Sequence, residues 1–293
     1  MTQHTKITTP HTANTVPTQF VDVAGRRLAY RQIGTGPDLV LALRFRGVMD
    51  SWDPAFLDAL ARNFTVTTFD YSGLGQSTGT PSYVRTDMAR DILDLADSLG
   101  LERFTVGGWS IGGIAAQIIA ADHPERVSHA ILLGTIPPGP QPHAAEPLFL
   151  ETALKPDYDL DDEAILFFEP ASPASVAAAK ASHDRIAARV ADLSPPIPPE
   201  TYLTILKASN DPEAVFPDPT GHYDAFFRKG ELPVLVISGD HEIVFPVENW
   251  HALNRKWPAL HILTIPEAGH APQHQHPEMI AGLIAGFTRT TPL

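Results

Sequence analysis

Short apolar runs recur along the chain and alternate with longer segments of helical spacing. Apolar and polar positions alternate on either side of Ala24-Gly25, which predicts an opening β-hairpin. Alternation of strands with helices is typical of a parallel sheet covered on both faces, so we expect an α/β fold with a mostly parallel central sheet of about eight strands. The predicted strands are residues 20–23, 27–33, 39–43, 64–69, 104–107, 130–133, 234–237 and 261–265.

The alternation stops between residues 137 and 230, where proline-rich joints separate stretches of helical character. Residues 172–193 have the apolar spacing of a long amphipathic helix. We therefore predict a helical cap inserted after the sixth strand. The expected organisation is a flexible N-terminal tail (1–19), a first part of the core (20–136), the cap (137–230) and a second part of the core (231–293).

Composition narrows the classes of function that the chain can have. The sequence has 21 Lys and Arg residues against 34 Asp and Glu residues, a formal net charge of -13 at pH 7, which repels phosphate backbones and anionic lipid surfaces. Nucleic acid and membranes are therefore not expected as partners. The sequence has no cysteine, which excludes thiolate catalysis and disulfides. Any nucleophile must be an oxygen or an amine.

Targeting signals are not expected either. Residues 1–19 are polar and rich in Thr, without the apolar stretch of a signal peptide. No later segment approaches the roughly 20 unbroken apolar residues of a membrane-spanning helix. We expect a cytoplasmic protein that acts on a small-molecule substrate, and a homodimer stays open as its assembly.

The run Gly108-Trp109-Ser110-Ile111-Gly112 has the Gly-x-Ser-x-Gly pattern of a nucleophile elbow. In such an elbow, small neighbours allow a sharp turn from strand to helix that exposes the serine hydroxyl. The pattern alone is weak, and the alternative is a glycine-rich turn that happens to contain a serine. Here an apolar strand precedes the pattern and an apolar helix follows it (residues 114–121), so we favour Ser110 as a nucleophile.

A serine hydroxyl is too weak an acid to attack a carbonyl at neutral pH without a base, most often a His that a carboxylate orients. The last two predicted strands are followed by Asp240 and Glu242 and by His270, respectively. Because the reactive crevice of an open α/β sheet forms beyond the carboxyl ends of its strands, these side chains are expected at one edge with Ser110. His270 is the predicted base.

From Phe20 to the C-terminal helix, the sequence resembles the α/β-hydrolase superfamily. The resemblance rests on the elbow and on the chain order serine, acid, histidine. It is strengthened by two further motifs: a turn similar to the family's Asp-x-x-Gly-x-Gly-x-Ser, and a run after the predicted nucleophile helix. These are Asp70-Tyr71-Ser72-Gly73-Leu74-Gly75-Gln76-Ser77 and His123-Pro124-Glu125-Arg126-Val127. The resemblance implies a serine hydrolase with a catalytic triad.

The acid of the triad departs from the family pattern. Aligning Gly239 and Pro246 with the family's Gly-x-x-Asp-x-x-x-Pro places Glu242 where Asp is usual. The longer Glu side chain can still reach the histidine, so we favour Glu242. Asp240 is the alternative acid, and its other role would be that of a turn residue.

The oxyanion hole departs from the pattern too, because the family usually has His-Gly after the third strand and this chain has Leu43-Arg44-Phe45-Arg46-Gly47. The resemblance implies that the backbone N–H groups of Phe45 and Ile111 form the hole.

The two arginines of this loop have two interpretations. A guanidinium beside the pocket could bind a substrate carboxylate through paired hydrogen bonds. Alternatively, Arg44 and Arg46 could form structural ion pairs with Asp50 and Asp53, which lie close in the sequence. We favour the ion pairs.

The expected activity is hydrolysis of a small to medium, largely apolar carboxylic ester or lactone through an acyl-enzyme. A carbon–carbon bond hydrolase or a perhydrolase with the same triad is one alternative. A protein that binds a small ligand on a hydrolase scaffold is another, since fold does not settle function. No cofactor is expected. No metal is expected either, because His274 and His276 lack partners that would complete a ligand set.

Overall fold

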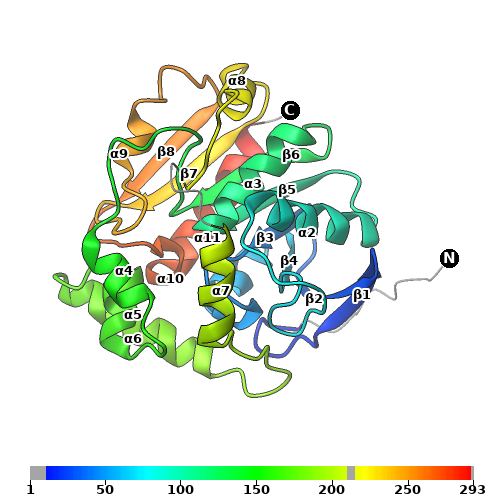
Figure 1. Cartoon of the computed structure of the whole chain (residues 1–293), viewed down its shortest axis with the longest axis vertical. Helices are drawn as coiled ribbons and strands as arrows, with labels where there is room; N and C mark the ends of the chain where they lie inside the picture. Colours follow the sequence, from blue (N-terminus) through cyan, green and yellow to red (C-terminus); the bar gives the residue numbers. More distant parts are fainter. Residues whose placement is uncertain (1–10, 210–214, 292–293) are drawn as a thin grey trace.

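Eight strands form one central sheet in the computed structural model, which describes residues 11–209 and 215–291 (Figure 1). In chain order they are β1 (Gln19–Val23), β2 (Arg26–Ile33), β3 (Asp38–Ala42), β4 (Thr65–Phe69), β5 (Phe104–Trp109), β6 (Val127–Leu133), β7 (Val234–Gly239) and β8 (Leu260–Ile265). The predicted α/β fold with a mostly parallel sheet is confirmed, and each predicted strand overlaps an observed one.

The spatial order of the strands is β1-β2-β4-β3-β5-β6-β7-β8. The pairs β1·β2 and β2·β4 are antiparallel, and the other neighbours are parallel. Strands β5 and β7 are buried along their whole length, which explains why they are predominantly apolar rather than alternating. The parallel strands bring their carboxyl ends to one edge, and the loops after β3, β5, β7 and β8 meet there.

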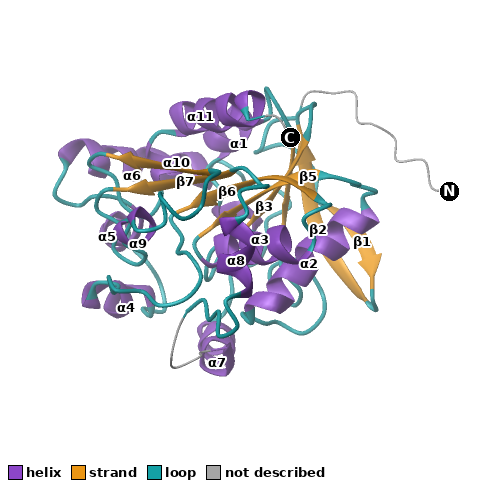
Figure 2. Ribbon diagram, turned by 90° about the horizontal axis from the view of Figure 1, so that it is seen from above, coloured by secondary structure: helices purple, strands orange, loops and turns teal. Residues whose placement is uncertain are grey.

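Helices cover both faces of this sheet (Figure 2). Figure 2 shows α1 and α11 on one face and α2, α3 and α8 on the other. The helices of the core are α1 (Pro54–Leu60), α2 (Arg85–Ser98), α3 (Ile111–Asp122), α9 (Glu248–His251), α10 (Pro272–Gln275) and α11 (Pro277–Thr290), with a 3-10 turn at Met49–Ser51. Several begin at the signals that their sequences carry: Asp53 caps α1, and Pro277 is the first residue of α11.

Among the described residues, five helices lie between β6 and β7. They are α4 (Pro147–Ala153), α5 (Leu160–Phe167), α6 (Pro173–Ala187), α7 (Pro199–Ser209) and α8 (His222–Arg228). In Figure 1, α4 to α7 lie at the end of the molecule away from α8. Helix α8 contacts the core helix α3 instead, although it belongs to the segment predicted to be the cap.

Helix α6 is shorter than predicted. It ends at Ala187, whereas the apolar spacing extends to residue 193. Asp192 has a left-handed backbone with φ of 57°, and prolines follow at 195 and 196. Neither feature is compatible with continuing an α-helix, so local backbone preferences end the helix before the apolar pattern does.

Part of the segment that we predict to be a flexible tail packs against the core. Val16 is 2% exposed. The Arg189 guanidinium donates hydrogen bonds to the carbonyl oxygens of Ala13 (2.9 Å) and Val16 (2.8 Å). The structure differs from the expectation here because a cation 173 residues further along the chain binds these carbonyls.

The turn between β5 and α3 depends on glycines that have no room for a side chain. A Cβ added to Gly108 would lie 2.1 Å from the carbonyl oxygen of Gly112. We expect Gly108→Ala to lower the free energy of unfolding by about 1–3 kcal/mol or more, because backbone on both sides must shift. Urea unfolding measures this change.

The control for this prediction is Gly282→Ala in α11, where an added Cβ would meet no heavy atom within 4 Å. In that helix, alanine is expected to leave the free energy of unfolding unchanged or to raise it by up to about 1 kcal/mol. Equal stabilities of the two variants would contradict the steric argument.

Candidate active site

Ser110 lies in the sharp turn between β5 and α3. Its backbone has φ of 60° and ψ of −128°, a conformation that residues other than glycine rarely adopt. The turn is held by two hydrogen bonds, from Ser110 N–H to the Leu133 carbonyl and from Gly113 N–H to the Ser110 carbonyl, both 2.9 Å. This strand–turn–helix geometry is the setting that the Gly-x-Ser-x-Gly pattern requires.

His270 and Glu242 form a buried pair in the loops that follow β8 and β7. The His270 Nδ1 atom lies 2.8 Å from both carboxylate oxygens of Glu242, and the two side chains are 2% and 0% exposed. Glu242 Oε1 also accepts the N–H groups of Val244 (3.1 Å) and Phe245 (3.2 Å). The carboxylate therefore has a fixed position, and it favours the imidazole tautomer with the proton on Nδ1.

Asp240, the alternative acid, does not contact His270. It is exposed, and its Oδ1 accepts the N–H of Ala268 at 3.3 Å. This is the behaviour of a residue that stabilises a turn. The structure thus pairs the histidine with Glu242.

Trp109 connects the serine turn to the histidine loop. Its indole N–H donates to the His270 carbonyl at 2.8 Å, and the two rings lie 5.8 Å apart. Because Trp109 immediately precedes Ser110, this bond places the two loops side by side. Within residues 11–209 and 215–291, the Ser110 hydroxyl has no hydrogen-bond partner. Contacts between a nucleophile and its base often tighten only when substrate binds.

Gly134 is a residue that the sequence reasoning missed. It follows β6 with φ of 45°, and an added Cβ would lie 3.0 Å from both Glu242 Oε2 and His270 Nδ1. Any side chain here would push the pair apart. The available signal was a glycine directly after an apolar strand that neighbours the serine strand in the sheet.

The two predicted oxyanion donors lie at the ends of adjacent elements. Ile111 is the first residue of α3, and Phe45 follows β3. A Cβ on Gly112 would lie 2.5 Å from the Ala42 carbonyl, so the start of α3 packs directly on the end of β3. Neither the Phe45 nor the Ile111 N–H donates a hydrogen bond in the part of the chain that the structure describes, which leaves both free for another acceptor.

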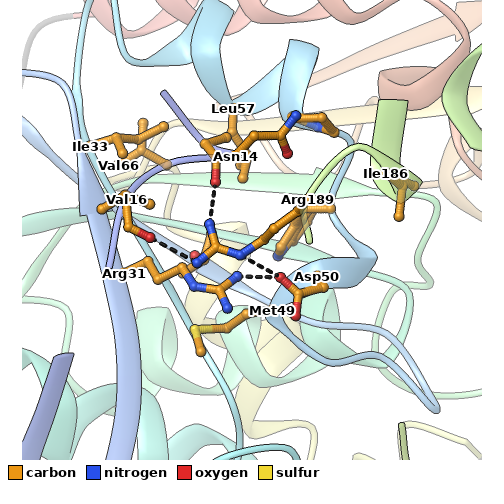
Figure 3. Close-up of a pocket in the computed structure, with 14 residues that line it drawn as sticks. Asn14, Val16, Arg31, Ile33, Met49, Asp50, Leu57, Val66, Ile186 and Arg189 are labelled. Atoms are coloured by element: carbon orange, nitrogen blue, oxygen red, sulfur yellow. Dashed lines mark hydrogen bonds and ion pairs between the residues drawn. The ribbon is translucent and has the colours of Figure 1, made fainter. Parts of the chain in front are cut away.

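The favoured interpretation of the loop arginines is wrong. Asp50 forms ion pairs with Arg31 and Arg189 (Figure 3). Asp53, fully buried, pairs with Arg185 from α6, with a nitrogen–oxygen distance of 2.5 Å. Proximity in the sequence misled the prediction, because both carboxylates point toward arginines that arrive from distant segments.

Arg46 instead joins the loop after β3 to the helices between β6 and β7. Its guanidinium donates to the carbonyls of Ala153 (2.9 Å), Lys155 (2.6 Å) and Pro156 (2.7 Å). It also lies between two tyrosine rings, 4.2 Å from the centroid of Tyr158 and 4.0 Å from that of Tyr202. This side chain therefore ties the loop that carries Phe45 to the end of α4, to the loop between α4 and α5, and to α7.

Aromatic side chains surround the imidazole. The rings of Phe167 and Phe245 lie 6.5 Å and 5.9 Å from that of His270. Burial lowers the pKa of His274 to about 4, so this nearby histidine is neutral at neutral pH. The environment of the His270 ring is thus largely apolar, and Ser110 itself is only 5% exposed.

Other features of the molecule bear on what the site can bind. Within the described residues, no group of three or more His, Asp or Glu side chains is arranged to hold a metal ion. None of the described helices is both long and apolar enough to cross a membrane. A cavity of about 20 Å³, room for a single water, lies beside Arg31 and Arg189 and is not lined by Ser110 or His270 (Figure 3).

Comparison with known proteins is consistent with this geometry. Residues 45–277 match the family model described as alpha/beta hydrolase fold. An alpha/beta hydrolase fold protein from Chitinophaga pinensis superposes with a TM-score of 0.82 at 25% identity, over 96% of this chain and 100% of that chain. A pimeloyl-[acyl-carrier protein] methyl ester esterase from Yersinia enterocolitica is 26% identical over 80% of this chain and 86% of its own length. The enol-lactonase from Burkholderia xenovorans LB400 shares the fold, with a TM-score of 0.67 at 20% identity, over 92% of this chain and 100% of that chain.

Proposed function

The chain belongs to the alpha/beta hydrolase fold family and is a hydrolase, and from this premise we propose that it is a serine hydrolase of small to medium carboxylic esters or lactones. The observation that carries the proposal is the buried His270–Glu242 pair beside the strained Ser110 turn. In this family a base held in that way serves a serine nucleophile.

The proposed reaction begins with attack of the Ser110 hydroxyl oxygen on the substrate carbonyl carbon. His270 Nε2 takes the hydroxyl proton, and Glu242 stabilises the imidazolium through Nδ1–H. The N–H groups of Phe45 and Ile111 donate to the oxyanion of the tetrahedral intermediate. Its collapse breaks the ester bond, and His270 returns the proton to the leaving alcohol. Water then hydrolyses the acyl-enzyme by the same sequence of steps.

The aromatic surroundings of His270 support a substrate with an apolar body. Trp109, Phe167 and Phe245 all lie within 6.5 Å of the imidazole, ring centroid to ring centroid. Pockets lined in this way bind apolar groups and use a few polar atoms to orient them. The similarity to a methyl ester esterase and the shared fold with an enol-lactonase are in keeping with an ester or lactone.

We further propose that α4 to α7 act as a cap over the site. Two contacts support this. The Phe167 carbonyl at the end of α5 accepts the Ala271 N–H at 2.8 Å, next to His270, and the Arg185–Asp53 pair joins α6 to the start of α1. Because the triad residues are buried beneath them, these helices are expected to move when substrate enters.

A fluorophosphonate reagent tests the proposal directly, because it phosphonylates a serine that a neighbouring base activates. We expect a covalent adduct on the peptide that contains Ser110, found by mass spectrometry, with loss of p-nitrophenyl ester hydrolysis in proportion to labelling. Denatured protein is the control and should not react. Labelling elsewhere, or full activity in the labelled protein, would contradict the proposal.

A further inference from the structure

Arg44 is a cation beside the proposed active site, and no carboxylate of the described residues forms an ion pair with it. Its Nε is buried and has no hydrogen-bond partner. Of the five N–H donors of a guanidinium, one makes a hydrogen bond to a described residue, from Nη1 to the Phe45 carbonyl at 2.7 Å. The remaining donors are available to a ligand.

No Asp or Glu oxygen of the described residues lies within the 4.0 Å of an ion pair with Arg44. The acids that could have served are engaged elsewhere: Asp53 with Arg185, and Glu163 with His183 at 3.0 Å. Burial lowers the pKa of Arg44, and the positive charge of Arg46 lowers it further, yet a guanidinium stays protonated at neutral pH. The charge is therefore retained without a carboxylate of the described residues in ion-pair contact, although the more distant Glu163 carboxylate still favours it.

A cation without a counter-ion in contact destabilises the folded protein unless a ligand compensates its charge. Arg44 is half-buried, and a cation partly removed from water without a counter-ion in contact loses solvation energy that aromatic contacts replace only in part. The guanidinium carbon of Arg44 lies 4.5 Å from the ring centroid of Phe167 and 5.1 Å from that of Trp109. These contacts stabilise the cation by about 0.5–2 kcal/mol each, but they leave the buried Nε without a hydrogen-bond partner among the described residues.

The position of the guanidinium relates it to the proposed chemistry. Trp109 immediately precedes Ser110, and the Phe167 ring is stacked 6.5 Å from the His270 ring. Arg44 contacts both of these aromatic side chains, so it belongs to the same wall that surrounds the imidazole. A substrate that binds against these aromatic side chains would meet the cation.

We infer that Arg44 binds a carboxylate on the substrate, so that the preferred substrates are half-esters of dicarboxylic acids or lactones that carry a free carboxylate. This inference rests on the proposed serine hydrolase function. The planar fork of a guanidinium matches the two oxygens of a carboxylate, and in a site from which water is excluded such charge-assisted hydrogen bonds are strong. The apolar body of the substrate lies along Trp109 and Phe167.

The test compares two esters that differ only in the distal charge: mono-p-nitrophenyl adipate, with a free carboxylate, and its methyl-capped neutral analogue. The measured quantity is the ratio of kcat/KM for the acid to kcat/KM for the neutral ester. We expect the wild type to favour the acid and Arg44→Met to reduce this ratio by roughly 10- to 100-fold, the size of a lost charge-assisted hydrogen bond. The corresponding succinate, glutarate and pimelate esters locate the best length.

Two further variants control this comparison. Arg62→Met removes an exposed arginine whose partner is Glu278, and it should leave the ratio at its wild-type value. Arg44→Lys keeps a charge but not the planar fork, so its ratio should fall between those of the wild type and Arg44→Met. It also replaces Arg44→Met in the comparison if the latter fails to fold, as thermal unfolding would reveal.

The outcomes separate this inference from the proposed function. If esters are hydrolysed but the wild type does not prefer the acid, or the preference survives in Arg44→Met, the carboxylate site is refuted while the hydrolase proposal stands. If no ester is hydrolysed, titration calorimetry with monomethyl adipate decides instead. Binding to the wild type that Arg44→Met loses supports the site, and absent or unchanged binding overturns it.

Discussion

Ser110→Ala is expected to lower kcat for p-nitrophenyl ester hydrolysis by on the order of 10⁴-fold or more, because the acyl-enzyme can no longer form. The backbone turn should persist, since alanine differs only by the lost hydroxyl and that hydroxyl makes no hydrogen bond to the described residues. Steady-state kinetics with a series of acyl lengths measures the effect, and the same series reports which chain length the wild type prefers.

The matched control is Ser98→Ala. The Ser98 hydroxyl bonds the Asp94 carbonyl within α2, at 2.8 Å, and has no contact with the site. Its kcat should equal that of the wild type. A Ser110→Ala enzyme that kept most of its activity would rule out the serine mechanism, and the remaining turnover would have to come from another group.

Glu242→Gln is expected to lower kcat by about 10²- to 10⁴-fold, because it favours the wrong tautomer of His270. The N–H groups of Val244 and Phe245 both donate to Glu242 Oε1. In the glutamine variant the amide oxygen is expected to keep these two bonds, which turns the amide NH₂ toward His270 Nδ1. Nδ1 must then accept, the proton moves to Nε2, and the imidazole can no longer take the Ser110 proton.

Asp240→Asn is the control for this change, two residues away and of the same chemical kind. Its carboxylate is exposed and bonds only the Ala268 N–H among the described residues, so we expect kcat within a few-fold of the wild type. Kinetics of both variants on one ester settle the assignment. A large loss in Asp240→Asn with little change in Glu242→Gln would transfer the role of triad acid to Asp240.

The loop after β3 combines two arginines with different surroundings. Arg46 donates to three carbonyls at the end of α4 and in the loop that follows it, which connects the loop after β3 to the helices of the proposed cap. Arg44, two residues earlier, has no such partners and lies against the aromatic wall. One loop therefore contacts the proposed cap through Arg46 and the proposed substrate site through Arg44. The backbone N–H of Phe45, which lies between the two arginines in the sequence, is the proposed oxyanion donor.

The sequence by itself determined the strands, their alternation with helices and the positions of Ser110, Glu242 and His270. Such features depend on short-range physics. A strand buried on both faces is predominantly apolar rather than alternating, and a turn as sharp as that at Ser110 requires small neighbours such as Gly108 and Gly112. Both requirements are visible in a few consecutive residues, so they could be predicted.

Only the tertiary structure decided which charged side chains meet. Asp53 is paired by Arg185, 132 residues further along the chain, so among the described residues Arg44 has no carboxylate at ion-pair distance. Ion pairs depend on distances of a few ångströms between segments that sequence separation does not predict, because the packing of α6 on the core sets them. The packing of α5 likewise places Phe167 against His270, and the tertiary structure alone shows that Arg44 lies beside the proposed chemistry.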